Sequence, residues 1–301
     1  MKKWLMVIRA PFLLLAVVLG FLGAGIAWYG SRETGATFDF NLGYALLAGL
    51  GILLAHISVN VLNEYFDYRS GVDFRTPKTP FSGGSGALPG GLVSARQALV
   101  LGVGTLVAIV PLGIFFTLTT GWALLPLLAV AAACIVLYTP LILKMGWPEW
   151  APGVGLGSLP VLGAYFVHAG AFPMSAVIAS VPSGILVHNL LLLNEFPDAE
   201  ADVTVRRRTM PIVLGKRRAS LVYSALTVVV YLWIVGAVIA GVMPPFSLLG
   251  LLTIPLAVKA IRGALQYQDM GKVVPAMASN VMVVLLTQLL MGVGYIVAGV
   301  I

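Results

Sequence analysis

The sequence predicts an all-α fold: a polytopic membrane protein whose nine transmembrane helices form one bundle. Three observations lead to this prediction. Hydrophobic residues make up 59% of the 301 residues and charged residues only 10%, with a mean hydropathy of +1.00. Soluble domains carry about 25% charged residues, so this chain cannot build a normal water-exposed surface. Long apolar runs also recur along the chain, and nearly all lysines and arginines fall on one side of them.

Nine apolar runs can each form a membrane helix, because the hydrocarbon core of a bilayer needs roughly 20 helical residues. In chain order they cover residues 11–28, 44–62, 98–118, 122–138, 151–167, 174–193, 220–240, 246–260 and 274–301. We expect kinks where proline interrupts a run, at Pro126, Pro160, Pro182 and Pro255. The first run is too long for a signal peptide, so we expect it to be retained. Residues 1–301 are treated as a single membrane domain.

Lysine and arginine predict how the chain is oriented. If the N-terminus is cytoplasmic, 17 of the 18 Lys and Arg residues fall in cytoplasmic segments and only Arg32 lies outside. This bias is the positive-inside pattern of multi-pass membrane proteins. It predicts a protein of the cytoplasmic membrane with its C-terminus outside and the lipid bilayer as its surroundings. We expect no nucleic-acid partner and no obligate protein partner.

Two acidic stretches follow the second and the sixth apolar runs, and both are therefore expected on the cytoplasmic side. The first runs from Asn63 through Asp67 to Asp73, and the second runs from Asn194 through Asp198 to Asp202. Asn and Asp at i and i+4 share one helix face, so each stretch can direct oxygen atoms at one point. The matching positions predict two repeats, spans 1–4 and 5–8, with an additional ninth span and one site where the repeats meet.

These oxygen-bearing side chains predict a magnesium site. Carboxylate and amide oxygens are ligands that Mg²⁺ takes in proteins, usually together with substrate phosphates. A diphosphate bridged by Mg²⁺ would neutralise both acidic stretches. The predicted metal ligands are Asn63, Asp67, Asp73, Asn194, Asp198 and Asp202.

Several basic residues on the same side are candidates for binding the diphosphate. They are Arg69, Arg75, Lys78, Lys144, Arg207 and Arg208. Lys144 ends the segment that begins at Tyr138, at the expected mouth of the site, and both residues are counted as catalytic candidates with Asp67 and Asp198. For any single basic residue, anchoring to anionic lipid headgroups is an equally good interpretation.

Polar residues within the second and sixth runs are candidates for an acceptor pocket. His56, Asn60 and Asn63 lie at i, i+4 and i+7 on one face, and His188 and Asn189 precede Asn194. A hydrogen bond between helices is the alternative role for each histidine. The glycine-rich segment 79–91 is expected to be a mobile lid or a plain turn over the site.

The two acidic stretches resemble the Asp-rich motifs of the UbiA superfamily of intramembrane prenyltransferases. Residues 194–202 fit the family's second motif fully, and residues 63–73 fit the first with Asp73 two residues late. That spacing, together with segments 83–85 and 157–165, is similar to the branch that prenylates 1,4-dihydroxy-2-naphthoate for menaquinone. Residues 208–215 resemble the segment after the second motif. Three positions depart from the common pattern, namely Val203, Arg206 and Val213.

The resemblance implies a nine-helix bundle that transfers a polyprenyl group from a polyprenyl diphosphate to an aromatic acceptor. It implies two Mg²⁺ ions on the diphosphate, held by the residues named above. Asp67 and Asp198 would assist ionisation of the allylic C–O bond with Lys144 and Tyr138. Asn63, Asn194, Arg69, Arg75, Lys78, Arg207, Arg208, His56, Asn60, His188 and Asn189 would bind the substrates.

Other functions are compatible with the same residues. The acceptor could be 4-hydroxybenzoate, a geranylgeranylglyceryl phosphate or a porphyrin-type ring, or the chain could cyclise its own substrate. A secondary transporter is a more remote alternative, since transporters also use repeats and buried acids. Transporters place ionisable groups near the membrane midplane, whereas here the acids gather at one face.

Overall fold

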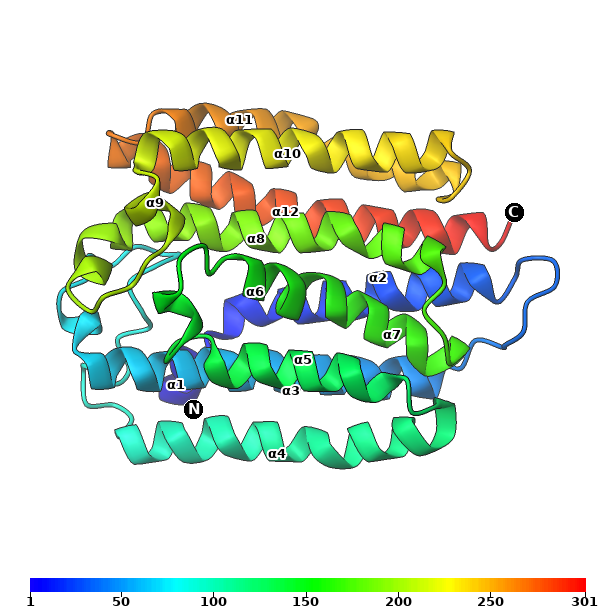
Figure 1. The fold of residues 1–301 in the computed structure, drawn as a ribbon, viewed down its shortest axis with the longest axis horizontal. Coiled ribbons are helices and arrows are strands. Elements are labelled where there is room, and N and C mark those ends of the chain that lie inside the picture. Colours follow the sequence, from blue (N-terminus) through cyan, green and yellow to red (C-terminus); the bar gives the residue numbers. More distant parts are fainter.

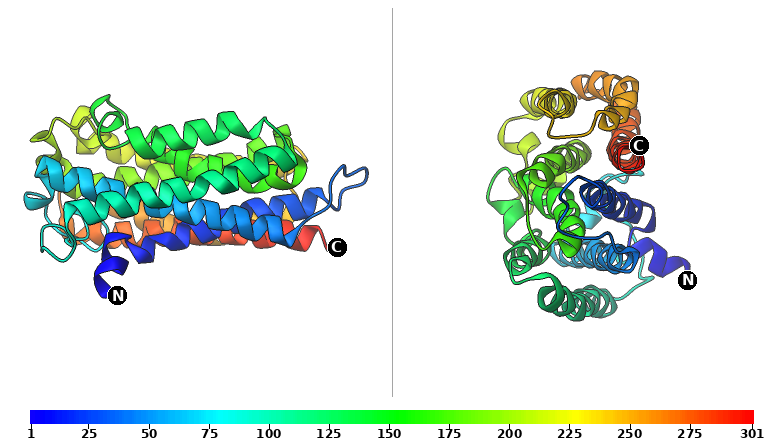
Figure 2. Two further views of the ribbon diagram at one scale, coloured as in Figure 1. Left: turned by 90° about the horizontal axis from the view of Figure 1, so that it is seen from below. Right: turned by 90° about the vertical axis from the view of Figure 1, so that its right-hand side faces the viewer.

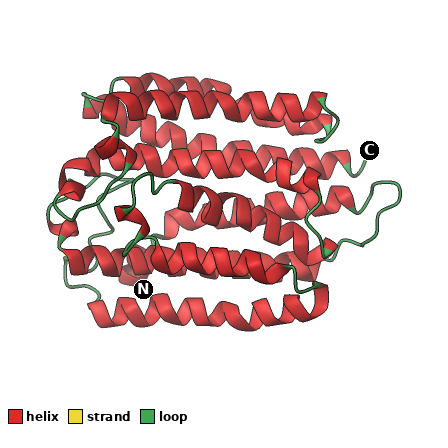
Figure 3. Ribbon diagram, viewed as in Figure 1, coloured by secondary structure: helices red, strands yellow, loops and turns green.

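Long helices that run roughly along a common axis make up the protein, as the computed structural model of residues 1–301 shows (Figure 1). The chain contains helices and turns but no β-strand (Figure 3). The helices are α1 (Lys2–Val7), α2 (Leu14–Gly30), α3 (Leu42–Ser70), α4 (Ala95–Thr120), α5 (Leu124–Leu137), α6 (Trp150–Pro152), α7 (Leu159–Ala169), α8 (Met174–Val203), α9 (Met210–Val213), α10 (Lys216–Ile239), α11 (Ile254–Leu265) and α12 (Met270–Ala298). The predicted all-α fold is confirmed.

Eight segments are long and apolar enough to cross a membrane. The fourth predicted span corresponds to α5, which has only 14 residues and is shorter than a usual membrane helix. The number nine is therefore approximate, while the multi-pass architecture is confirmed. Exposed valines, leucines and isoleucines cover α4, and their exposure is expected for a helix that faces lipid.

Two helices extend beyond their predicted ends and carry the acidic stretches with them. The second run was expected to end at residue 62 and the sixth at residue 193, but α3 continues to Ser70 and α8 to Val203. No helix breaker follows residue 62 until Gly71, which adopts a left-handed conformation with φ 78° and caps α3. Asn63 and Asp67 therefore lie on α3 itself.

The fifth predicted span is built from three helical pieces. Between α6 and α7, residues Gly153–Ser158 form a π-helical segment, and Pro160 follows in the first turn of α7. A Cβ atom at Gly157 would lie 2.7 Å from the carbonyl oxygen of Ser183 on α8. Glycine at this position allows the two backbones to approach closely, which a side chain would prevent.

Helices α2, α8 and α12 form the centre of the bundle, with α10 and α11 on one side and α3, α4 and α5 on the other (Figure 1). The largest apolar core joins Leu22 of α2, Leu186 of α8, Ile234 of α10 and Met291 of α12, all nearly or fully buried. The loops that follow α3 and α8 lie at one end of the bundle, and the C-terminus lies at the other (Figure 2). The acidic stretches are thereby brought to the same end.

Candidate active site

A cavity of about 90 Å³ lies where the ends of α3 and α8 meet. All six predicted metal ligands line it: Asn63, Asp67, Asp73, Asn194, Asp198 and Asp202. Asn63 and Asp67 come from α3, Asp73 from the short 3₁₀ turn Val72–Phe74, and the other three from α8. The expectation that both stretches build one site agrees with this placement.

Arg207 connects the two stretches directly. Its guanidinium donates a hydrogen bond of 2.8 Å to the carboxylate of Asp202 and forms a second ion pair with Asp67. Burial by itself would lower the pKa of Arg207, but the charges of Asp67 and Asp202 outweigh it, so its pKa lies above the ordinary value. Arg207 therefore neutralises part of the acidic cluster from within the chain.

A tight turn after α8 brings Arg207 back onto the cluster. The backbone N–H of Arg207 donates to the carbonyl oxygen of Asp202 at 3.1 Å, and Arg206 adopts a left-handed conformation with φ 62°. Glycine is the residue that tolerates this conformation best. Arg206, one of the three positions that depart from the pattern of the resemblance, thus lies where the backbone favours glycine.

Among the predicted metal ligands, Oδ2 of Asp73, Oδ1 of Asn194 and Oδ1 of Asp198 are buried and have no hydrogen-bond partner, and both carboxylate oxygens of Glu195, which also lines the cavity, are in the same state. Asn63 donates its amide N–H to the hydroxyl of Thr139 at 3.0 Å, which fixes the side chain at the cavity wall. Buried oxygens without partners are costly, and hard divalent cations with oxygen ligands satisfy them. This donor set fits Mg²⁺.

The cavity is not a closed metal cage. No three acidic or histidine side chains come together closely enough to hold a metal ion by themselves. Burial, followed by the charges of Asp67 and Glu64, raises the pKa of Asp73 to about 7. A nearby cation would favour the ionised form of Asp73, and a Mg²⁺ ion here would take further oxygen ligands from a substrate phosphate.

Arg9 is a cavity residue that the sequence analysis missed. It precedes α2, lines both the acidic cavity and the apolar cavity beside it, and donates a 2.7 Å hydrogen bond to Glu64. Burial lowers its pKa, but Glu64 and two nearby aspartates raise it further, so the pKa stays above its ordinary value. In the sequence Arg9 looked like an ordinary cationic anchor before an apolar run, so only its contact with Glu64 distinguishes it.

The glycine-rich segment closes one side of the acidic cavity. Phe81, Ser82 and Gly84 line the cavity, and Ser85 donates to Glu64 through both its backbone N–H (2.8 Å) and its hydroxyl (2.6 Å). A Cβ atom at Gly84, where φ is 70°, would lie 2.8 Å from Oδ1 of Asp73. The segment is thus a tethered cover whose glycines allow close approach to a carboxylate.

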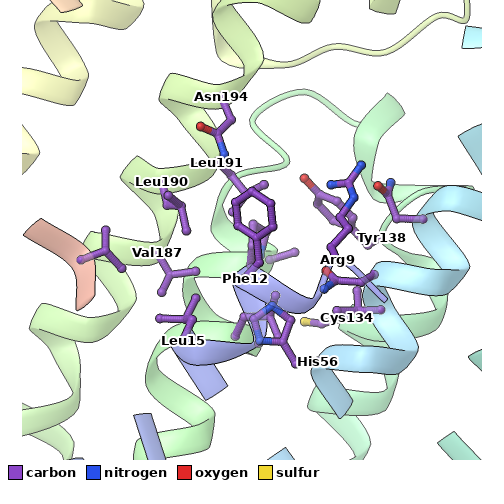
Figure 4. Close-up of a pocket in the computed structure, with 18 of the residues that line it drawn as sticks. Arg9, Phe12, Leu15, His56, Cys134, Tyr138, Val187, Leu190, Leu191 and Asn194 are labelled. Atoms are coloured by element: carbon purple, nitrogen blue, oxygen red, sulfur yellow. The ribbon is translucent and has the colours of Figure 1, made fainter. Parts of the chain in front are cut away.

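A second cavity of about 130 Å³ adjoins the acidic one and is mostly apolar. The two share Arg9, Asn63, Tyr138 and Asn194 among their lining residues. Figure 4 shows Arg9, Tyr138 and Asn194 toward one end and His56 with Leu15 toward the other. Asn60 also lines this cavity and donates to the carbonyl oxygen of Ile8 at 3.1 Å. A charged head and an apolar tail can therefore occupy adjacent spaces.

Most of the predicted basic residues lie elsewhere. Arg69, Arg75, Lys78, Lys144 and Arg208 are exposed and line neither cavity. Arg207 is the one member of the predicted set that reaches the cavity.

The structure also separates His188 and Asn189 from both cavities. His188 accepts a hydrogen bond of 3.0 Å from the indole N–H of Trp147. Asn189 donates to the carbonyl oxygen of Tyr223 at 3.0 Å and to the hydroxyl of Thr227 at 2.9 Å. These contacts join α8 to neighbouring segments, as the alternative role for the histidines stated, and they do not support the predicted substrate-binding role of His188 and Asn189.

Comparison with known proteins identifies the family. The sequence profile of the UbiA prenyltransferase family matches residues 34–287. The chain belongs to this family. The 1,4-dihydroxy-2-naphthoate octaprenyltransferase of Bacillus subtilis (strain 168) is 30% identical over 231 residues, covering 76% of this chain and 73% of that protein. The predicted UbiA prenyltransferase is thereby confirmed.

Solved structures of UbiA homologues share the fold. The apo structure of a homologue from Aeropyrum pernix K1 has a TM-score of 0.70 at 18% identity, covering 95% of this chain and 98% of that one. A homologue from Archaeoglobus fulgidus, bound to GPP and Mg²⁺, has a TM-score of 0.58 at 14% identity, covering 98% and 99%. At these identities the likeness concerns the fold of this UbiA prenyltransferase.

Proposed function

We propose that this UbiA prenyltransferase transfers a polyprenyl group from a polyprenyl diphosphate to an aromatic acceptor, 1,4-dihydroxy-2-naphthoate. One observation carries the proposal. A cavity with unpartnered carboxylate and amide oxygens and two arginines adjoins a larger apolar cavity. The relative from Bacillus subtilis, a naphthoate octaprenyltransferase, supports the choice of acceptor.

The diphosphate would sit in the acidic cavity together with magnesium. Asn63, Asp67, Asp73, Asn194, Asp198 and Asp202 are the residues that would hold two Mg²⁺ ions there. Magnesium supplies positive charge that offsets the diphosphate and stabilises it as a leaving group. The Archaeoglobus homologue bound to GPP and Mg²⁺ supports the binding of a prenyl diphosphate together with magnesium.

Arg9 and Arg207 would act on the charge that develops when the donor ionises. As the allylic C–O bond breaks, its electron pair moves onto the diphosphate oxygen and leaves an allylic carbocation. Fixed guanidinium groups near that oxygen stabilise the negative charge more strongly than water does. Arg207 is already oriented by Asp202, so it needs little reorganisation to take this role.

The apolar cavity would receive the acceptor ring and the first part of the prenyl chain. Phe12, Leu15 and Val187 exclude water, which would otherwise capture the carbocation. A ring carbon of the acceptor attacks the cation and forms the new C–C bond. The ring then regains aromaticity by losing a proton or, where a carboxylate occupies that carbon, carbon dioxide. His56, Asn60 and Tyr138 are positioned in the wall to orient the acceptor's polar groups.

The site would open to the cytoplasm, with the N-terminus inside and the C-terminus outside. Charge placement supports this orientation, since 17 of 18 Lys and Arg residues then lie inside. The water-soluble acceptor would enter from the cytoplasm, and the polyprenyl donor would enter from the bilayer.

Product mass tests the proposed function. Membranes containing the protein are incubated with octaprenyl diphosphate, Mg²⁺ and a panel of acceptors. We expect a prenylated naphthol only with 1,4-dihydroxy-2-naphthoate. If product forms with 4-hydroxybenzoate, a geranylgeranylglyceryl phosphate or a porphyrin-type ring instead, the proposed acceptor is wrong but the proposed ionisation step still holds. If a cyclised product forms without any acceptor, the protein catalyses cyclisation of the prenyl diphosphate and the proposed transfer reaction is wrong.

A further inference from the structure

A deep apolar groove runs between α3, α4, α5 and α7 on the side of the bundle that carries α4. Its volume is about 550 Å³, compared with about 130 Å³ for the central apolar cavity. Among its lining residues are Gly51 and Ala55 of α3, Val110 of α4, Leu128 and Ala132 of α5, and Gly163 of α7. His56 contributes the one polar side chain of the wall. The groove therefore suits an apolar occupant.

The groove adjoins the central cavity. His56, Ile135, Gly155 and Leu156 line both the groove and the central cavity. The central cavity in turn shares Asn63 with the acidic cavity. The acidic cavity, the central cavity and the groove therefore lie next to one another in that order.

The groove arises from the shape of α5. This helix has 14 residues, whereas α3 and α4 have 29 and 26. Small residues face the space on several sides, and a Cβ atom at Gly113 of α4 would already lie 3.1 Å from a methyl group of Leu128. A short helix beside two longer ones leaves volume that its neighbours do not fill.

His56 marks the point where the two spaces join. The side chain is buried, with 4% of its surface exposed, and its Nδ1 atom has no hydrogen-bond partner. A buried nitrogen without a partner is costly inside a protein. Its position, at the junction and facing both spaces, indicates that a bound molecule passes or ends beside it.

We propose that the groove holds the distal part of the donor's polyprenyl chain. The proposal rests on the proposed function, because it takes the diphosphate end to be anchored in the acidic cavity. Among the reactants, the donor alone combines a charged head with an apolar chain too long for the central cavity. The polyprenyl chain would bend past His56, and the groove would determine which chain lengths the enzyme accepts.

Adjacent alanines on α5 provide a matched test. Ala132 lines the groove and Ala133 does not, although both are exposed. We expect Ala132→Phe to lower kcat/KM for octaprenyl diphosphate by at least about tenfold. It should leave kcat/KM for the short geranyl diphosphate within about twofold of wild type, because the short chain ends inside the central cavity. Ala133→Phe should change neither value.

A second variant tests whether the prenyl chain leaves the central cavity by another path, between α2 and α12. Leu285 of α12 lines that cavity but not the groove. If Leu285→Trp, and not Ala132→Phe, selectively impairs the octaprenyl substrate, the chain leaves between α2 and α12 and the proposal is wrong. Failure of the wild-type protein to ionise any prenyl diphosphate would instead refute the proposed function.

Photolabelling of the wild-type protein gives an answer that is independent of how the variants fold. A long prenyl diphosphate with a diazirine at its far end is bound with Mg²⁺, irradiated, and mapped by peptide mass spectrometry. We expect labelled peptides from α4 and α5, displaced by excess unlabelled donor. Labels confined to α2 and α12 would overturn the proposal. Labels on α5 that the unlabelled donor does not displace would also overturn it, because they would indicate that bilayer lipid occupies the groove.

Discussion

Arg207 forms an ion pair with Asp67, a residue 140 positions earlier in the chain. The same guanidinium binds Asp202 at 2.8 Å, so one arginine joins the two acidic stretches. Both partners are largely buried, with side-chain exposures of 10% and 4%. A cation that belongs to the chain therefore joins the two acidic stretches and offsets part of their charge.

The two acidic stretches should act as a unit. We expect Asp67→Asn and Asp198→Asn each to remove nearly all turnover. The double variant should lose little more turnover than either single variant, because effects within one site are not additive. Asparagine is nearly isosteric, so thermal stability in detergent should survive and serves as the control. Near-normal turnover of Asp198→Asn beside an inactive Asp67→Asn would contradict a shared site.

Arg207 should be more important than its neighbour Arg208. Arg207→Gln leaves Asp67 and Asp202 without their buried cation, which should cost about 3–5 kcal/mol of stability and lower the melting temperature in EDTA. Added Mg²⁺ should restore more stability in this variant than in wild type. Arg208→Gln is the matched control, because its side chain is exposed. Equal losses in both variants would favour the role that the sequence alone predicted for Arg208.

Glu64 should control binding of the diphosphate through Arg9 and the glycine-rich segment. It is fully buried, pairs with Arg9 at 2.7 Å and accepts two hydrogen bonds from Ser85. We expect Glu64→Gln to raise KM for the prenyl diphosphate about tenfold, with KM for the acceptor unchanged. Ser85→Ala removes only one hydrogen bond, worth about 1 kcal/mol, and should be milder. The idea fails if both KM values rise together.

Metal removal should abolish turnover. Carboxylates and a diphosphate repel each other, and two arginines cannot offset all of that charge, so excess EDTA should inactivate the enzyme and Mg²⁺ should restore it. Binding of a prenyl diphosphate, followed by thermal shift, should also weaken without Mg²⁺. Full activity in EDTA would exclude the metal role.

Membrane orientation can be tested by thiol labelling. In a Cys134→Ser background, a cysteine at Ser70 should react only with reagent that reaches the cytoplasmic side, and a cysteine at Ser31 only from outside. The reason is the placement of Lys and Arg on one side of the membrane. If the cysteine at position 70 reacts only with reagent added outside, the predicted orientation is wrong.

The sequence by itself determined the class of fold and the Asn and Asp side chains that line the acidic cavity. Composition and the spacing of apolar runs distinguish a membrane protein from a water-soluble one, because a helix in lipid must be long and apolar, with its backbone groups hydrogen-bonded internally. The spacing of Asn63, Asp67, Asn194 and Asp198 is local, and a helix converts it directly into one polar face. These features depend on neighbours in the chain, so they could be predicted without coordinates.

Only the tertiary structure decided which charges meet. Arg9 and Arg207 enter the cavity, whereas Lys144 and Arg208 point to solvent, although all four looked alike in the sequence. His188 and Asn189 turned out to join helices, and His56 to stand between two cavities. The physical reason is that a side chain's partner depends on turns and helix packing far away in the sequence. A left-handed Arg206 turns Arg207 onto Asp202, and a short α5 leaves the groove open beside His56.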